Sequence, residues 1–120
     1  MKFLLVFIGG GLGAAARFGV SETIKTTSQF PWNTFAVNLV GCFLIGLLSY
    51  YAVRGNQTVF LLGIVGFLGG FTTFSSYGIE LFRMIETQEW KTGISYFLLS
   101  NVLGIMLVYI GYMVSSNWLR

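Results

Sequence analysis

The residues of this chain that could do chemistry are neutral hydrogen-bonding groups, set one at a time inside long apolar runs. In one run, four residues fall on one stripe at helical spacing, and the polar Thr34 and Asn38 are among them: Thr34, Asn38, Gly41 and Ile45. Another run carries a similar stripe: Tyr96, Ser100 and Gly104, with Asn101 beside it. An isolated Asn in such a run often only bonds a neighbouring helix, and Ser often bonds its own helix backbone. Two uncharged polar stripes together favour a narrow hydrated path.

A third apolar run is interrupted by a stretch that predicts a break in a helix. Gly69 and Gly70 are followed by Thr72, Thr73 and a pair of serines, a poor composition for a continuous helix. Backbone that is freed at membrane depth must line a cavity, bind an ion or be buried in protein. A break also exposes the N-terminus of a half-helix, which carries free N–H donors and partial positive charge.

Two aromatic residues and one carboxylate follow the predicted break. Phe74 and Tyr77 lie about one turn apart on one face of the following helix, and Glu80 lies close to that face. Aromatic pairs at this spacing serve packing in many helices, and a Glu near a helix end is often only interfacial. The sequence leaves open whether these three residues have only such structural roles or belong to a functional site.

The composition excludes most other classes of function. Of 120 residues, 55% are hydrophobic and 9% are charged, whereas soluble domains have about 25% charged residues. The chain has no His and a single Cys, so neither an internal disulfide nor a Cys/His metal site is expected. No nucleophile–base pair is apparent, so an enzyme is not expected. The cations are scattered singly, so nucleic-acid binding is not expected despite the net charge of +3.

Four membrane-spanning helices are needed to position these residues. A span needs about 20 apolar residues, and the expected spans are 3–20, 32–53, 59–84 with the break, and 92–114. Trp32, Trp90 and Trp118 lie at their ends, where amphipathic rings settle at the level of the lipid headgroups. We therefore predict an all-α integral membrane protein with one domain, residues 1–120.

The first span adds a packing motif and a charge. Gly9 and Gly13 form a small-x-x-x-small pattern that allows close helix approach, and Arg17 follows one turn later. Arg17 either extends to the membrane surface as an anchor or faces an aqueous vestibule. An alternative interpretation of this run is a signal peptide that ends near Ala14 and Ala16. The Gly-rich stretch fits the apolar core of a signal peptide poorly.

The cations give almost no bias between the two sides of the membrane. With four alternating spans, the two sides hold these groups: Lys2, Arg54 and Arg120 on one, and Lys25, Arg83 and Lys91 on the other, with Arg17 inside or near the first span. Because the positive-inside rule needs an excess on one side, insertion in both orientations is one interpretation. Two opposed copies could then pair around an axis in the membrane plane. The other interpretation is an orientation that a simple count misses.

At this point the sequence resembles the Fluc (CrcB) fluoride channels over essentially its whole length. The resemblance rests on residues 66–77 followed by Glu80, on Gly13-x-x-x-Arg17, and on residues 33–41. It implies a passive, fluoride-selective channel of a prokaryotic cell membrane, through which cytoplasmic fluoride leaks out. It also implies four-helix subunits in an antiparallel dual-topology dimer with two pores. A heterodimer with a sister subunit stays open, because some members are encoded as pairs.

The resemblance also implies roles for particular residues. The implied fluoride path consists of six side chains: Thr34, Asn38, Phe74, Tyr77, Tyr96 and Ser100. Arg17 and Glu80 are implied to lie in a vestibule or beside the pore. Backbone carbonyls of Gly69 and Thr72 from both subunits are implied to hold a structural sodium ion.

Two residues depart from the family pattern. Tyr77 stands where the second aromatic is usually Phe, and Gly104 stands where some members carry Ser. On the sequence alone, Tyr77→Phe is expected to be tolerated.

Two rival functions remain. A small proton-coupled drug exporter needs a carboxylate inside its first helix, whereas this chain has Arg17 and no acidic residue before Glu22. A helper subunit that only packs against a partner would leave the polar stripes without a purpose.

Overall fold

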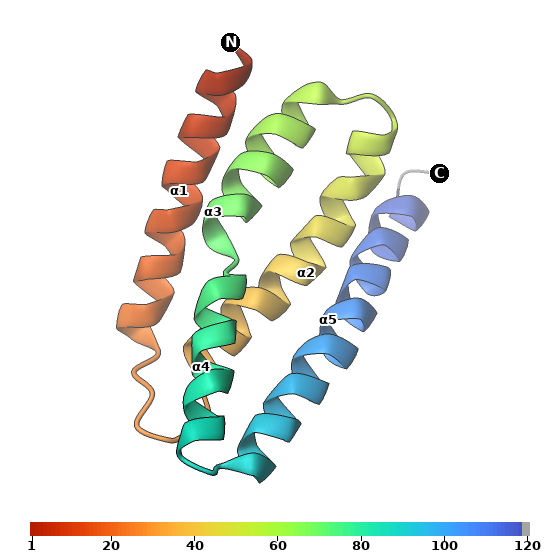
Figure 1. Ribbon diagram of the computed structural model, residues 1–120. Helices are drawn as coiled ribbons and strands as arrows, with labels where there is room; N and C mark the ends of the chain where they lie inside the picture. The colour runs from red at the N-terminus through yellow and green to blue at the C-terminus, as the bar shows by residue number, and fades with distance from the viewer. Residues whose placement is uncertain (119–120) are drawn as a thin grey trace.

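The computed structural model describes the backbone of residues 1–118 and the side chains up to Asn117. Two predicted interfacial groups, the Trp118 side chain and Arg120, lie outside this part. The described chain is helical, and its loops join four long antiparallel spans (Figure 1). Its longest dimension is 47 Å, which suits a bilayer of about 40–45 Å including the headgroups.

The first two spans are single helices: α1 (Lys2–Thr23) and α2 (Trp32–Val53). Each has 22 residues, and at 1.5 Å per residue each is about 33 Å long, enough to cross the hydrocarbon core. The second span begins and ends at the predicted residues. Trp32 is half exposed at its start, as expected for a residue at the lipid headgroups.

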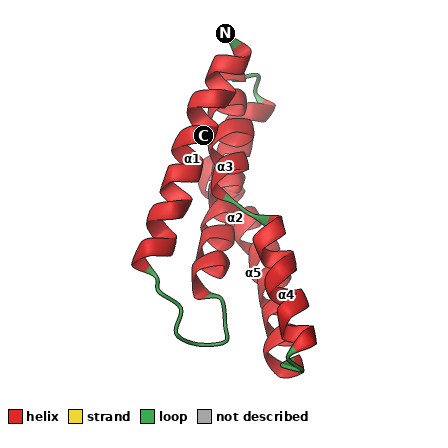
Figure 2. Cartoon of the chain, turned by 60° about the vertical axis from the view of Figure 1, so that its left-hand side comes forward, coloured by secondary structure: helices red, strands yellow, loops and turns green. Residues whose placement is uncertain are grey.

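The third span is built from several segments. It consists of a π-helical stretch, η1 (Val59–Leu68), a short turn, α3 (Gly69–Phe71), and α4 (Phe74–Glu86). Thr72 and Thr73 between α3 and α4 have extended backbone, with ψ of 157° and 110°. Figure 2 shows this break as a loop between two helical segments. The predicted break is therefore confirmed, but it is confined to two residues rather than spread over 69–76.

The fourth span is α5 (Trp90–Trp118), and it begins and ends a few residues beyond the predicted 92–114. Polar residues at both ends continue the helix past the apolar run, so hydropathy alone underestimates its length. Trp90 is 54% exposed at the start of the helix, as expected for an interfacial ring.

Glycines set the packing of the spans in two pairs. On α1, a Cβ at Gly9 would collide with the Leu62 carbonyl, and one at Gly13 would collide with the Phe67 carbonyl. The predicted small-x-x-x-small motif is thus a packing surface against the third span. Gly46 of α2 approaches the Val108 carbonyl of α5 equally closely. The pairs α1 with the third span, and α2 with α5, form the frame that holds the break.

Candidate functional site

Asn38 holds the break in the third span from the neighbouring helix α2. Its Oδ1 accepts the Thr73 N–H at 2.9 Å, and its Nδ2 donates to the Thr73 carbonyl at 3.1 Å. The amide side chain therefore replaces the helical acceptor of the Thr73 N–H, a group that is costly to leave unpaired in a membrane, and adds a donor to the Thr73 carbonyl. A Cβ at Gly41, about one turn further along α2, would collide with the Thr72 side chain, so α2 lies directly against the break.

Thr73 starts the helix that follows the break. Its Oγ1 accepts the Ser76 N–H at 3.1 Å, which is the geometry of an N-cap. Thr73 was not predicted to be a helix cap, although a Thr three residues before Ser76 at a predicted break is a recognisable capping signal. The two helical segments are therefore fixed by side chains on both sides of the gap.

The same contacts release two backbone carbonyls. In an unbroken helix, the Thr73 N–H would bond the Gly69 carbonyl and the Ser76 N–H would bond the Thr72 carbonyl. Here the first N–H goes to Asn38 and the second goes to Thr73 Oγ1. Gly69 is exposed, and the residues around the break line a hollow of about 380 Å³ together with Asn38 and Phe74.

Glu80 joins three spans below the break. Thr34 Oγ1 of α2 donates to Glu80 Oε1 at 2.6 Å, and the Tyr96 hydroxyl of α5 donates to Glu80 Oε2 at 2.8 Å. Tyr96 is completely buried, and Thr34 is 6% exposed. The structure therefore brings together three of the residues named from the sequence and places Glu80 among interior hydroxyls, not as a merely interfacial carboxylate.

The two aromatic residues after the break differ sharply in exposure. Phe74 is 83% exposed, whereas Tyr77 is 8% exposed and packs edge-on against Tyr96, with ring centroids 5.1 Å apart. The Phe74 and Tyr77 centroids are still only 5.8 Å apart. The pair therefore links the interior around Tyr96 to an open face of the subunit.

Other aromatic rings enclose the ring of Tyr96. Phe30, from the loop between α1 and α2, lies edge-on at 5.3 Å, and Phe35 lies at 6.3 Å. Phe30 was not named from the sequence, because a loop residue gives no periodic signal. These rings hold the Tyr96 ring in the orientation in which its hydroxyl donates to Glu80.

The stripe of Tyr96, Ser100 and Gly104 lies along the inner face of α5, as its helical spacing predicts. Gly104 is buried, Ser100 is half-buried, and a Cβ at Gly104 would lie 3.2 Å from Cys42 Sγ of α2. Asn101, beside the stripe, donates to the Tyr77 hydroxyl at 3.1 Å. This partner of Asn101 was not predicted from the sequence, because the two residues lie on different helices.

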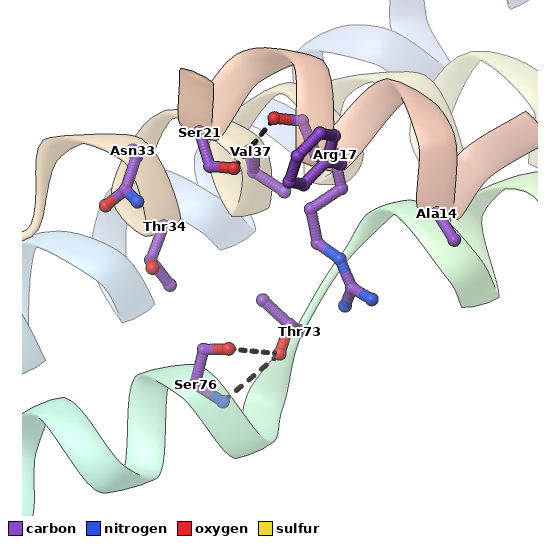
Figure 3. A pocket seen from close by; sticks show the side chains of 9 residues that line it. Ala14, Arg17, Ser21, Asn33, Thr34, Val37, Thr73 and Ser76 are labelled. Carbon is purple, nitrogen blue, oxygen red and sulfur yellow. Dashed lines mark hydrogen bonds between the residues drawn. The ribbon is translucent and has the colours of Figure 1, made fainter. Parts of the chain in front are cut away.

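Arg17 lines a hollow of about 340 Å³ between α1, α2 and the break. Figure 3 shows its side chain reaching from α1 toward Thr73, with Thr34 and Ser76 also on the lining. Arg17 is half-buried, and it faces a polar hollow that also contacts the Glu80 network through Thr34. Of the two sequence interpretations, this position favours the vestibule.

Comparison with known proteins gives a consistent result over nearly the whole chain. The family described as "CrcB-like protein, Camphor Resistance (CrcB)" matches residues 4–112. A protein of Helicobacter acinonychis (strain Sheeba), named "Fluoride-specific ion channel FluC", is 37% identical, with 98% of each chain covered. Proteins of the same name from Azobacteroides pseudotrichonymphae and Helicobacter pylori (strain P12) are 40% and 36% identical. The alignments cover 96% of each chain for the first, and 97% of this chain and 94% of the relative for the second.

Proposed function

The chain belongs to the CrcB-like family, and from this premise we propose that it is a fluoride-specific channel through which cytoplasmic fluoride leaves the cell passively. It is a multi-pass membrane protein of a prokaryote, with four helices long and apolar enough to cross a membrane. Its relatives are named as ion channels, which agrees with the prediction that it is not an enzyme. The observation that carries the proposal is the row of neutral donors that the structure gathers around the break and Glu80.

The chemistry of fluoride fits such a row. Fluoride is small and strongly hydrated, so a path must replace its water with hydrogen-bond donors. The amide of Asn38 and the hydroxyls of Thr34, Tyr96 and Ser100 are donors of this kind. Phe74 offers the positive edge of its ring on the open face. Because conduction needs several weak sites, uncharged donors suit passage better than a fixed cation deep in the path.

Glu80 sets a condition on this path. Each of its two oxygens accepts a hydrogen bond from a hydroxyl group, one from Thr34 and the other from Tyr96. Fluoride must compete with the carboxylate for these donors. The binding of fluoride at the two hydroxyls is therefore linked to the position of the Glu80 side chain. Arg17, on the hollow next to Thr34, gives the vestibule a positive charge that attracts anions.

We propose an antiparallel, dual-topology dimer with two pores. The near-even distribution of cations supports it, and so does the exposure of Phe74, a large ring with little cover within its own subunit. The partner is a second copy of the chain, or a sister subunit in a heterodimer. Membrane lipid covers the remaining apolar surface.

We also propose that the released carbonyls of Gly69 and Thr72 bind a structural sodium ion between the two subunits. Two copies provide four carbonyl oxygens, a hard donor set without thiolate or imidazole, which suits a hard monovalent cation. The support is the diversion of the Thr73 and Ser76 N–H groups, which leaves these two carbonyls without their helical donors. Bound sodium would neutralise carbonyl repulsion and hold the two broken helices together.

Flux from liposomes, followed with a fluoride electrode, tests the function. Purified protein should release trapped fluoride down its gradient and release hardly any chloride. Comparable chloride rates would refute selectivity. Drug–proton exchange would favour the exporter, and the absence of both activities would favour the helper subunit.

A further inference from the structure

The Tyr77 hydroxyl has a hydrogen-bond partner that fixes the direction in which it donates. Asn101 Nδ2 donates both to the Phe97 carbonyl at 2.7 Å and to the Tyr77 hydroxyl at 3.1 Å. The Phe97 carbonyl only accepts, so the amide group facing it must be the NH₂. Rotating the amide by half a turn would place two acceptor oxygens against each other. The Tyr77 oxygen therefore accepts from Asn101.

The proton of the same hydroxyl is left for another acceptor. A phenol group has one O–H, which Asn101 Nδ2 cannot accept. Among residues 1–117, no side chain or carbonyl accepts a hydrogen bond from Tyr77. A donor without an acceptor is costly at membrane depth, so the proton is expected to find one outside the subunit.

The surroundings of this hydroxyl lie on the open side of the subunit. Its partner Asn101 is exposed, and the neighbouring Phe74 ring is 83% exposed. The Tyr77 ring also packs against Tyr96, whose hydroxyl lies on Glu80. The Tyr77 side chain thus lies between the exposed ring of Phe74 and the buried hydroxyl of Tyr96.

We propose that the Tyr77 hydroxyl is an additional hydrogen-bond donor to the permeating anion, and that Asn101 is its positioning residue. The inference rests on the proposed function and adds one binding position to it. The ligand is a small, hard anion that accepts strong hydrogen bonds, and a larger halide gains less from a single aimed O–H. The structure thereby changes the sequence-based expectation that Tyr77→Phe is tolerated.

The test is the removal of one oxygen atom. Tyr77→Phe keeps the ring, and it should lower fluoride flux about two- to tenfold, the range for one neutral hydrogen bond. The fluoride-to-chloride ratio should fall with it. Tyr109→Phe is the matched control, because Tyr109 is a 62% exposed tyrosine on α5, and its flux should equal that of the unchanged protein.

Asn101→Leu tests the positioning role. It leaves the Tyr77 hydroxyl in place without its orienting partner and should lower flux less than Tyr77→Phe does. The double variant should be no slower than Tyr77→Phe alone, because Asn101 acts through that hydroxyl. Losses that multiply in the double variant would overturn the positioning role.

Three outcomes would overturn the inference as a whole. Absence of fluoride flux in the unchanged protein refutes the proposed function and this inference with it. Normal flux and selectivity in Tyr77→Phe, with the unchanged protein conducting, refutes this inference alone. A dimer that dissociates in gel filtration while the remaining dimer conducts normally would show that the hydroxyl bonds the second subunit instead of the anion.

Discussion

Asn38→Ala is the most direct perturbation of the site, because it removes both contacts that hold the break. Hydrogen bonds between membrane helices average about 0.6 kcal/mol and reach about 1.7 kcal/mol. The two bonds to Thr73 are therefore worth roughly 1.2–3.4 kcal/mol together. At 1.4 kcal/mol per factor of ten, the loss corresponds to a fall of about tenfold or more in the population with the native break.

The assay is fluoride efflux from liposomes, with gel filtration to check whether the proposed dimer is present. Asn38→Ala should lower the flux at least about tenfold, through the lost donor and the loosened break together. Asn38→Asp keeps an acceptor for the Thr73 N–H but puts oxygen against the Thr73 carbonyl and adds a negative charge, so flux should be lost. Asn117→Ala, on an exposed part of α5, is the control. Unchanged flux in a dimeric Asn38→Ala variant would remove Asn38 from both the path and the break.

Four further outcomes are expected. Phe74→Ile should lower fluoride flux and leave the proposed dimer intact, because it removes the polarised ring edge and keeps comparable apolar bulk; full flux in that variant would exclude a ring-edge path. Gly46→Ala should cost about 1–3 kcal/mol of stability in thermal unfolding, whereas Gly11→Ala, with open space around it, should not, and equal effects would contradict the packing argument. Two or three Lys residues added at one terminus should bias insertion and reduce activity; a C-terminal tag found on one side only in the unchanged protein would refute dual topology. Sodium should give a density peak within about 2.5 Å of four carbonyl oxygens on the dimer axis, and an empty axis would refute it.

The spans were predictable from the sequence because each is an apolar run bounded by polar residues or Pro31. Trp32 and Val53 bound the second span as expected. The packing role of Gly9 and Gly13 was also predictable, since small residues at this spacing favour close helix approach in a membrane. These features depend on neighbours along the chain, which is the information that a sequence contains directly.

The exact break was not predictable, because it depends on a contact between two spans. Gly69 and Gly70 looked like the interruption, yet both are helical. The helix ends only where Asn38 takes the N–H of Thr73, and Asn38 is 35 residues away in sequence. The partner of Asn101 was not predictable for the same reason, since Tyr77 lies on another helix. Sequence reasoning identified the polar stripes but not the partner of each member.

Those partners bear on how a channel could select fluoride without a fixed cation in its interior. Thr34 and Tyr96 donate to Glu80, and Asn38 donates to the break. An anion gains a donor here only if it forms a stronger hydrogen bond than the protein acceptor already present. Fluoride concentrates its charge on a small surface, whereas larger halides are weaker acceptors. Because the amide of Asn38 and the hydroxyls of Thr34 and Tyr96 already have partners, the binding that remains for fluoride at these three positions is weak, which is the condition for passage.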